Sequence, residues 1–277
     1  MATAGYSLVQ LPGGGCAVYS RAYGEVMHPG SGPAVEAESL YIGQLKLRER
    51  LHQHEGEFVV WDVGLGAAAN TLAVLRASRD STCPLRLVSF DATLEPLAFA
   101  LAHSEALGYL RGFEPVVGKI LQDRRHDFTD GKHEVRWEIH VGDFPALLAS
   151  ATATSLPKPH AILFDPFSPA KNPAMWTLPV FENLFRLLDR ERPCALATYS
   201  RSTMVRVALL LAGFFVGRGR PSGVKEETTV AANRLELLDE PLDASWLQRA
   251  RKSGSAEPLR EARYRQLPLS PETWARL

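Results

Sequence analysis

Short, uninterrupted apolar runs recur along the chain, and stretches of helix-forming residues separate most of them. The clearest apolar runs lie at residues 58–63, 85–90, 135–141, 160–164 and 194–199. Continuous apolar strands that alternate with helices are typical of a parallel sheet covered on both faces. The pattern therefore predicts an α/β protein with a doubly wound, mostly parallel sheet.

Two regions near the ends of the chain depart from this alternation. Residues 7–11 and 16–20 flank a glycine-rich loop, which predicts a small N-terminal β-hairpin. Residues 214–216 and 228–232 follow one another with no helix between them. This second pair predicts a terminal antiparallel hairpin at one edge of the main sheet.

The length of 277 residues accommodates one large domain with additions, but not a second domain of full size. We expect the N-terminal hairpin and a polar opening segment over residues 1–33, and the main α/β domain over 34–238. A basic, proline-containing tail, 239–277, follows and either wraps the surface or stays partly mobile.

Two segments of the main domain stand out. Leu40, Leu47 and Leu51 share one face of a single amphipathic helix predicted over about residues 34–54. The connection over about 109–132 is long and rich in glycine and charge. Because long connections in compact domains are usually functional or disordered, we interpret it as an insertion that faces a partner.

Composition excludes several classes of protein. The 31 basic and 31 acidic residues balance, so any nucleic-acid partner must meet a local basic patch. The three cysteines are far apart and form no CxxC pair, which argues against a disulfide framework or a zinc site. The longest apolar run, 207–216, is half of the roughly 20 residues that a membrane span needs. We expect a soluble, cytoplasmic protein without a metal.

Acidic residues follow four of the predicted strands: Asp62, Asp91, Asp143 and Asp165. The carboxyl ends of parallel strands meet at one edge of a sheet, where open α/β sheets bind their ligands. The four carboxylates are therefore expected to line one crevice. Each of the last three also has a structural alternative, since Asp91 and Asp143 could cap helices and Asp165 could cap a turn.

Gly64 and Gly66 form the turn after the first core strand, where the backbone can approach a ligand and a helix N-terminus offers free N–H groups. A carboxylate at Asp91 can accept hydrogen bonds from a ribose. Ala69 stands where a dinucleotide site has its third glycine, and no basic partner for a pyrophosphate is nearby. S-adenosylmethionine fits better, because its sulfonium and ammonium suit carboxylates such as Asp62.

The loop after the fourth of these strands contains three prolines, which prevent strand or helix from continuing until Trp176. The loop is therefore expected to be stiff and to present Asp165, Lys171 and Asn172.

Two loops resemble those in the methyltransferase domain of the MnmC-type tRNA-modifying enzymes. Residues 62–70, DVGLGAAAN, are similar to the E-x-G-F-G-T-G-L-N loop of that family. Residues 165–176, DPFSPAKNPAMW, resemble its D-G-F-x-P-x-K-N-P-x-M-W loop over their whole length. Residues 21–28 also look like the opening segment of the stand-alone members, and the chain length matches a form without the FAD-dependent oxidase domain.

The resemblance implies a Rossmann-like class I fold and S-adenosyl-L-methionine as cofactor, with neither a metal nor FAD. It implies methylation of the primary amine of 5-aminomethyl-(2-thio)uridine at the wobble position, in the anticodon stem-loop of tRNA. A separate enzyme would supply the aminomethyl group. The implied cofactor-binding residues are Asp62, Gly64, Gly66, Asn70, Asp91 and Asp143; the implied catalytic residue is Asp165; and the implied substrate-binding residues are Phe167, Lys171, Asn172 and Trp176.

The residues leave several roles open. A carboxylate beside the amine can orient its N–H bonds and accept a proton, or hold the charged ammonium in place. Lys171 and Asn172 would contact phosphate or base, or fix the loop. Phe167 and Trp176 would stack on a flipped nucleoside or fill the core.

The chain departs from the family pattern at two positions. Ala68 replaces a glycine, which predicts ordinary backbone dihedrals there, and Pro166 replaces the glycine after the aspartate. Two rival functions remain: an aminopropyltransferase of the spermidine-synthase type, and a degenerate methyltransferase-like protein that binds RNA. Contact with RNA is predicted from the basic tail and from Arg124, Arg125, Arg218, Arg220 and Lys225.

Overall fold

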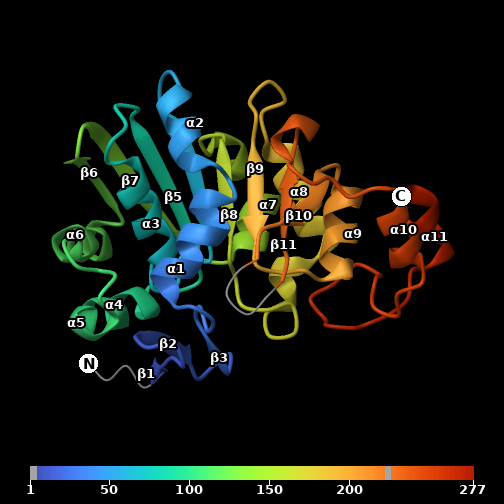
Figure 1. The fold of residues 1–277 in the computed structure, drawn as a ribbon, viewed down its shortest axis with the longest axis horizontal. Helices are drawn as coiled ribbons and strands as arrows, with labels where there is room; N and C mark the ends of the chain where they lie inside the picture. Colours follow the sequence, from blue (N-terminus) through green and yellow to red (C-terminus); the bar gives the residue numbers. More distant parts are fainter. Residues whose placement is uncertain (1–4, 222–225) are drawn as a thin grey trace.

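A computed structural model describes residues 5–221 and 226–277, and its centre is a sheet of eight strands (Figure 1). Five adjacent strands, β9, β8, β4, β5 and β7, pair with one another in parallel. β6 at one edge, and β11 and β10 at the other, are antiparallel additions. In spatial order the strands are β10 (Phe215–Gly219), β11 (Thr228–Ala232), β9 (Ala195–Thr198), β8 (Ala161–Phe164), β4 (Phe58–Val63), β5 (Leu85–Asp91), β7 (His133–Val141) and β6 (Arg125–Asp130).

This order confirms the predicted doubly wound α/β fold. The chain builds outward from β4 through β5 to β7 and then crosses back to place β8 on the other side of β4. The strand order therefore reverses between β4 and β8. In such sheets the loops at the carboxyl ends separate at this point and leave a crevice.

Side chains of β4 alternate between two hydrophobic cores, because successive residues of a strand point to opposite faces. Val60 lies in one core, whereas Trp61 and Val63 lie in the other, and all three are fully buried. The first core is covered by α1 (Pro33–Ala37), η1 (Glu38–Gly43), α2 (Leu47–Gln53), α3 (Ala69–Ser78), α4 (Glu95–Ala102), α5 (Ser104–Leu107) and α6 (Glu114–Asp123). The second is covered by α7 (Phe144–Ala149), η2 (Ala151–Ser155), η3 (Pro173–Trp176), α8 (Leu178–Leu187) and α9 (Thr203–Ala212).

The predicted N-terminal hairpin is present and belongs to a separate sheet of three strands (Figure 1). β1 (Tyr6–Gln10) pairs with β2 (Cys16–Ser20), and β2 pairs with the two-residue strand β3 (Glu25–Val26). The segment that leaves this sheet, residues 23–29, lines the cavity described below.

The prediction of a single helix over about residues 34–54 is wrong, because the structure divides this segment into α1, η1 and α2. η1 is a π-helical segment, and Lys46 has the left-handed φ of 50° before α2 begins. Leu40, Leu47 and Leu51 are nevertheless all buried, so the predicted apolar face is confirmed. π-helical segments often occur at functional sites, and this one carries Tyr41, which lies near the candidate catalytic carboxylate.

The long connection 109–132 is ordered as α6 followed by β6. β6 pairs with β7 along its whole length and adds an antiparallel strand to the sheet. Its exposed Arg125 forms an ion pair with Asp127. The length of this connection therefore has a structural explanation in addition to the predicted role in facing a partner.

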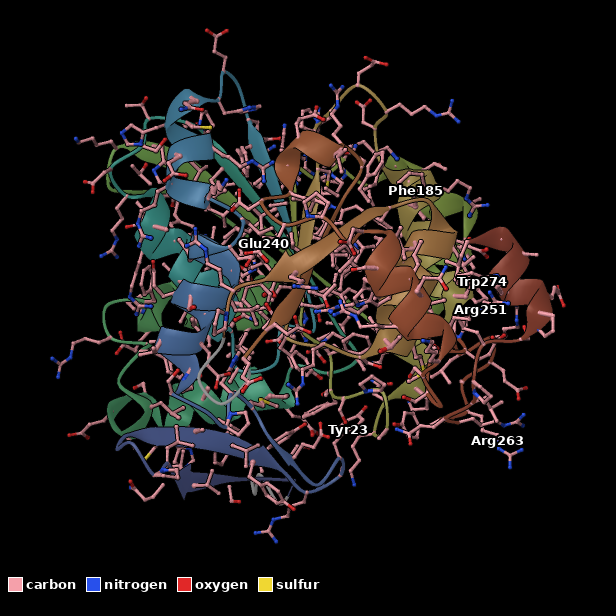
Figure 2. The ribbon with its side chains drawn as sticks, turned by 45° about the vertical axis from the view of Figure 1, so that its right-hand side comes forward. Tyr23, Phe185, Glu240, Arg251, Arg263 and Trp274 are labelled. Carbon is pink, nitrogen blue, oxygen red and sulfur yellow. The ribbon has the colours of Figure 1, made fainter. Side chains whose placement is uncertain are left out.

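The C-terminal tail packs on the outer face of α9 and wraps the surface. Trp246 of α10 (Ala244–Arg251) is buried against Val207 of α9. Arg251 lies over the ring of Trp274 in α11 (Pro271–Arg276), 4.7 Å from its centroid (Figure 2). A short 3-10 turn, η4 (Leu235–Leu237), precedes the tail.

The predicted terminal hairpin is formed by β10 and β11. Of its basic residues, Arg218 pairs with Glu227 at 3.8 Å, and the backbone N–H of Arg220 donates to Gln44. Lys225 lies outside the described residues. No helix within residues 5–221 and 226–277 has the length and apolar character to cross a membrane.

Candidate active site

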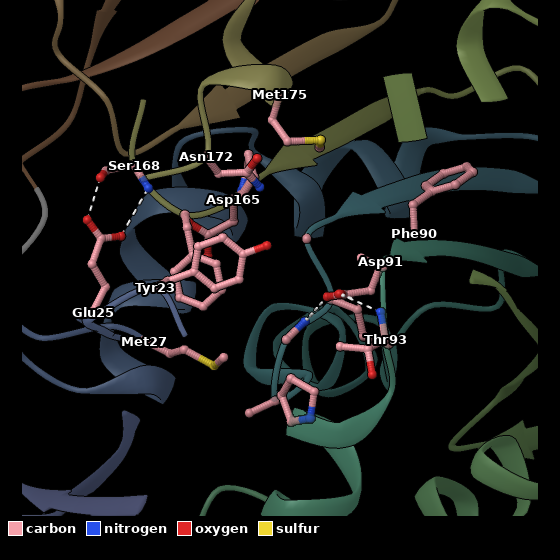
Figure 3. A pocket seen from close by; sticks show the side chains of 18 of the residues that line it. Tyr23, Glu25, Met27, Phe90, Asp91, Thr93, Asp165, Ser168, Asn172 and Met175 are labelled. Atoms are coloured by element: carbon pink, nitrogen blue, oxygen red, sulfur yellow. Dashed lines mark hydrogen bonds between the residues drawn. The ribbon is translucent and has the colours of Figure 1, made fainter. Parts of the chain in front are cut away.

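A cavity of about 750 Å³ opens at the carboxyl ends of the parallel strands, where the strand order reverses (Figure 3). The turn after β4 and the loop after β8 form two of its walls. The segment from Tyr23 to Pro29 closes a third side. Figure 3 shows Tyr23, Asp91 and Asp165 around the same space.

The turn after β4 has the close backbone approach that its glycines predict. Gly64 has a φ of +89°, and a Cβ atom there would lie 2.8 Å from the carbonyl oxygen of Asp165. Gly66 has a φ of +51°. Ala68 also adopts the left-handed conformation, with φ 63°, so the expectation of ordinary dihedrals at this position is wrong. The turn therefore has a left-handed residue at position 68 although glycine is missing there.

Asp91 lies at the end of β5 and holds the glycine turn in place (Figure 3). Its carboxylate accepts hydrogen bonds from the backbone N–H of Gly66 at 2.8 Å and of Thr93 at 3.3 Å. Burial raises its pKa, and these backbone donors oppose that effect. Asp91 does not cap a helix, because α4 has Leu94 as its N-cap and no side-chain cap. It lines the cavity, a position that is compatible with the predicted ligand contact.

Asp62 and Asn70 lie beneath the turn and are buried. Asp62 accepts a hydrogen bond from the Thr71 hydroxyl, and burial raises its pKa to about 7. Oδ1 of Asp62 and Oδ1 of Asn70 have no hydrogen-bond partner among the described residues. Buried acceptors without partners are costly. A bound molecule with cationic or N–H groups, reaching these oxygens directly or through water, would relieve this cost.

Asp143 is exposed and caps α7, since its carboxylate accepts a hydrogen bond from the Ala146 N–H at 3.0 Å. This is the helix-cap alternative. The residue also borders the cavity, on the side of Phe144 and Pro145.

Asp165 is a largely enclosed carboxylate that faces the cavity. Its side chain is 14% exposed, and its Oδ2 accepts a hydrogen bond of 2.7 Å from Asn70. His28 Nε2 lies 3.7 Å from the same oxygen. Burial raises the pKa of Asp165, while the positive charge of protonated His28 and the Asn70 hydrogen bond lower it. Burial outweighs the other two effects, so the pKa of Asp165 lies above its ordinary value.

The rest of the loop after β8 is fixed by specific contacts. Phe167 stacks on Tyr23 with 4.0 Å between ring centroids. Glu25 accepts hydrogen bonds from both the backbone N–H and the hydroxyl of Ser168 (Figure 3). Tyr199 donates to the carbonyl oxygen of Pro166 at 2.9 Å. The loop and the N-terminal segment therefore hold one another across the cavity.

The remaining predicted substrate residues separate into two groups. Phe167 and Asn172 line the cavity. Lys171 is exposed and lies outside the cavity wall, with its Nζ near Gly24. Trp176 is fully buried and donates its indole N–H to the carbonyl oxygen of Phe167, so it supports the loop from the core and offers no stacking face.

Sequence reasoning missed several residues that meet at Asp165. His28, Glu36 and Tyr199 line the cavity, and Tyr41 lies behind the carboxylate. Burial, together with the charge of Asp165, raises the pKa of Tyr41 well above its ordinary value. The sequence offers one signal for these residues: segment 21–28 resembles the opening segment of the family. That resemblance assigns no role to the His28 side chain.

The donor set fits S-adenosyl-L-methionine. The cavity offers the carboxylates of Asp91 and Asp165 together with the close glycine backbone. Asp62 and Asn70 are not among the residues that line the cavity, and each has a buried oxygen without a partner. No lysine or arginine lines the cavity among the residues described, which suits a cationic ligand and disfavours one with phosphates.

Comparison with known proteins supports this assignment. A family model described as S-adenosyl-L-methionine-dependent methyltransferase matches residues 111–234. Over these residues the chain resembles that methyltransferase family. The chain is 29% identical over 252 residues to the tRNA 5-methylaminomethyl-2-thiouridine biosynthesis bifunctional protein MnmC of Aeromonas hydrophila, covering 86% of this chain and 36% of the relative. It is 31% identical over 210 residues to the protein of the same name from Burkholderia pseudomallei strain K96243, covering 71% and 31%.

The chain is thus similar to the MnmC proteins, and it spans about a third of the length of these curated relatives. Among solved structures, MNMC2 from Aquifex aeolicus matches with a TM-score of 0.71 and 22% identity, covering 98% of this chain and 83% of that one. A probable spermidine synthase from Corynebacterium glutamicum matches with a TM-score of 0.52 and 13% identity, covering 95% of each chain. These two likenesses concern the fold.

Proposed function

We propose that this protein is a methyltransferase that transfers a methyl group from S-adenosyl-L-methionine to the primary amine of 5-aminomethyl-(2-thio)uridine at the wobble position of tRNA. The observation that carries the proposal is the position of Asp165. Its buried carboxylate faces an acid-lined cavity from a loop that resembles the MnmC-type substrate loop over its whole length. The curated relatives named for this tRNA modification support the same substrate.

The proposed reaction forms a bond between the amine nitrogen and the methyl carbon and breaks the bond between that carbon and sulfur. The amine must first lose a proton, because an ammonium has no lone pair for attack. Asp165 would accept a hydrogen bond from the amine and aim its lone pair at the methyl group. Asn70 fixes the orientation of the carboxylate by donating to its Oδ2.

An amine is a better acceptor for this site than a phosphate-bearing or anionic group. Asp91, Asp165 and Glu36 line the cavity, and each disfavours a second negative charge. The stacked pair of Tyr23 and Phe167 lies at the cavity wall, where it would contact a uridine turned out of the anticodon loop. Exposed Lys171 lies beside this pair, near Gly24, and would contact the RNA backbone.

The proposal places the reaction in the cytoplasm, after a separate enzyme has made the aminomethyl group. It is tested with purified protein and tRNA that carries 5-aminomethyluridine. Nucleoside mass spectrometry should show conversion to the 5-methylaminomethyl nucleoside with wild-type protein and not with Asp165→Asn. In a deletion strain the aminomethyl nucleoside should accumulate, and unchanged wobble nucleosides in that strain would overturn the proposed function.

Two further assays distinguish this function from its rivals. An aminopropyltransferase would use decarboxylated S-adenosylmethionine and a polyamine, so product formation from that pair in place of tRNA methylation would favour it. A degenerate RNA-binding protein would bind tRNA but give no heat on calorimetric titration with S-adenosyl-L-methionine.

A further inference from the structure

His28 lies between two carboxylates at the wall of the cavity. Its Nε2 is 3.7 Å from Oδ2 of Asp165, and its Nδ1 is 3.5 Å from Oε2 of Glu36. The three side chains are only 11–14% exposed. They come from three separate elements: the segment after β3, the loop after β8, and α1. A histidine that merely filled the core would not present both ring nitrogens to acids beside a ligand cavity.

The backbone holds this histidine in an unusual conformation. His28 has a φ of +58°, in the left-handed region that costs a non-glycine residue about 1 kcal/mol or more. The Gly30 N–H donates to Oε1 of Glu36 at 2.6 Å and so closes the turn around the carboxylate. Asn70 holds Asp165 on the other side. The strained backbone at His28 therefore accompanies the position of the imidazole between the two carboxylates.

We propose that His28 accepts, through Asp165, the proton that the substrate amine must lose before methyl transfer. This inference rests on the function proposed above. The ammonium donates a proton to the Asp165 carboxylate, and the carboxyl group formed in this way passes that proton from Oδ2 to Nε2 of neutral His28, which leaves a neutral amine, the carboxylate and an imidazolium. The amine then attacks the methyl carbon, the C–S bond breaks with its electron pair on sulfur, and the product is a secondary ammonium that keeps both protons of the amine.

A histidine suits this task better than a carboxylate alone. An ordinary aspartate titrates near pH 4 and is a weak acceptor for a proton from an amine, whereas imidazole titrates near 6.5, closer to the operating pH. Burial lowers the pKa of His28, but the hydrogen-bonded Glu36 and the charges of Asp165, Glu36 and Asp62 outweigh it and raise the pKa above its usual value. Tyr41 also faces this group of charges from η1, and its raised pKa keeps it protonated.

The proposal predicts a specific pH dependence. Only neutral His28 can accept the proton, so methylation by the wild type should rise with pH through the raised pKa of His28. Without the imidazole, the reaction must wait for an amine that has lost its proton in solution. His28→Asn, which tolerates a left-handed φ and keeps polar groups, should therefore reduce kcat at pH 7 on the order of 100-fold. The deficit should shrink toward high pH, with KM for tRNA changed less than about threefold.

Two further variants separate proton transfer from folding. His28→Gly relieves the positive φ and leaves space for free imidazole, which should restore part of the activity. Glu36→Gln keeps an oxygen for the Gly30 N–H but removes one negative charge, so the pKa of His28 should fall and the rise in rate should move to lower pH. NMR titration of the His28 ring, assigned by its absence in His28→Gly, measures the same shift without any reaction.

The results distinguish failure of this inference from failure of the proposed function. If wild type methylates aminomethyl-tRNA but His28→Asn shows the same deficit at every pH and imidazole restores nothing to His28→Gly, His28 is only structural. A His28 ring whose pKa is unchanged in Glu36→Gln also overturns the inference. If wild type does not methylate this tRNA although it binds S-adenosyl-L-methionine, the proposed function fails and the inference fails with it.

Discussion

The two loops that meet at the strand reversal are built in opposite ways. The turn after β4 has positive φ at Gly64, Gly66 and Ala68, and its shape depends on the backbone. The loop from Asp165 to Trp176 has no positive φ at any position. Prolines fix the shape of this loop instead, together with two hydrogen bonds. The Glu25 carboxylate accepts one from the loop backbone, and the Trp176 indole N–H donates the other.

This difference assigns the loops different tasks. The glycine turn removes side-chain bulk, so the backbone of Gly64 can approach Asp165 and the adjoining space is left for a cofactor. The proline loop presents one carboxylate at a fixed position. Substitutions in the glycine turn should therefore reduce the free energy of unfolding and the affinity for cofactor. Substitutions in the proline loop should reduce the rate of methylation.

The largest expected effect is on catalysis by Asp165→Asn. The amide keeps the shape of the side chain but loses the charge and the capacity to accept a proton. We expect kcat for tRNA methylation to fall about 10³-fold, equivalent to about 4 kcal/mol, while affinity for S-adenosyl-L-methionine by calorimetry stays within about threefold. Asp123→Asn, an exposed acid on α6, is the matched control and should retain full activity. A normal kcat in Asp165→Asn would contradict the role of the loop in presenting a catalytic carboxylate.

The second largest expected effect is the loss of stability in Gly64→Ala. The new Cβ would meet the backbone of Asp165 at 2.8 Å while the residue keeps a φ of +89°. Denaturant unfolding should show a loss of about 3 kcal/mol, from the left-handed conformation and the close contact together. Gly254→Ala, whose Cβ would enter open space at an ordinary φ, should be nearly neutral. Equal stability of these two variants would contradict the account of the turn.

A smaller effect concerns pH and the acid beneath the turn. The pKa of Asp62 is raised to about 7, so its ionised fraction grows as pH rises from 5.5 to 7.5. A cationic ligand prefers the ionised form, and affinity for S-adenosyl-L-methionine should therefore increase over this range by at most about tenfold per pH unit. Calorimetry of Asp62→Asn should show weaker binding with this dependence removed. The same pH dependence in both proteins would show that another group is responsible.

The smallest expected effect tests the left-handed alanine. In Ala68→Gly, relief of the positive φ offsets the loss of a buried methyl group, so the free energy of unfolding should change by less than about 0.5 kcal/mol. Ala69→Gly removes a buried methyl from the first residue of α3 without any such relief and should cost about 1.5 kcal/mol. A difference near zero between the two variants would mean that Ala68 carries no strain.

Much of the fold was predictable because it depends on local patterns. Continuous apolar strands required a sheet buried on both faces, and acids at four strand ends had to approach one edge. The interruption of the helix at Lys46 was not predicted, because 34–54 is rich in good helix formers and Gly43 alone does not specify a left-handed residue at Lys46. The left-handed φ of Ala68 was missed for a related reason, since the surrounding turn imposes a conformation that alanine does not prefer.

The sequence by itself determined the fold class, the glycine turn and the position of Asp165 at a strand end, since these follow from periodicity and backbone chemistry. Only the tertiary structure decided which side chains surround that carboxylate. His28 and Glu36 lie 137 and 129 positions before Asp165 (165 − 28 and 165 − 36), and no local pattern specifies contacts over such separations. For Trp176 the sequence left open a stacking surface or a place in the core, and its burial shows that it lies in the core and supports the loop.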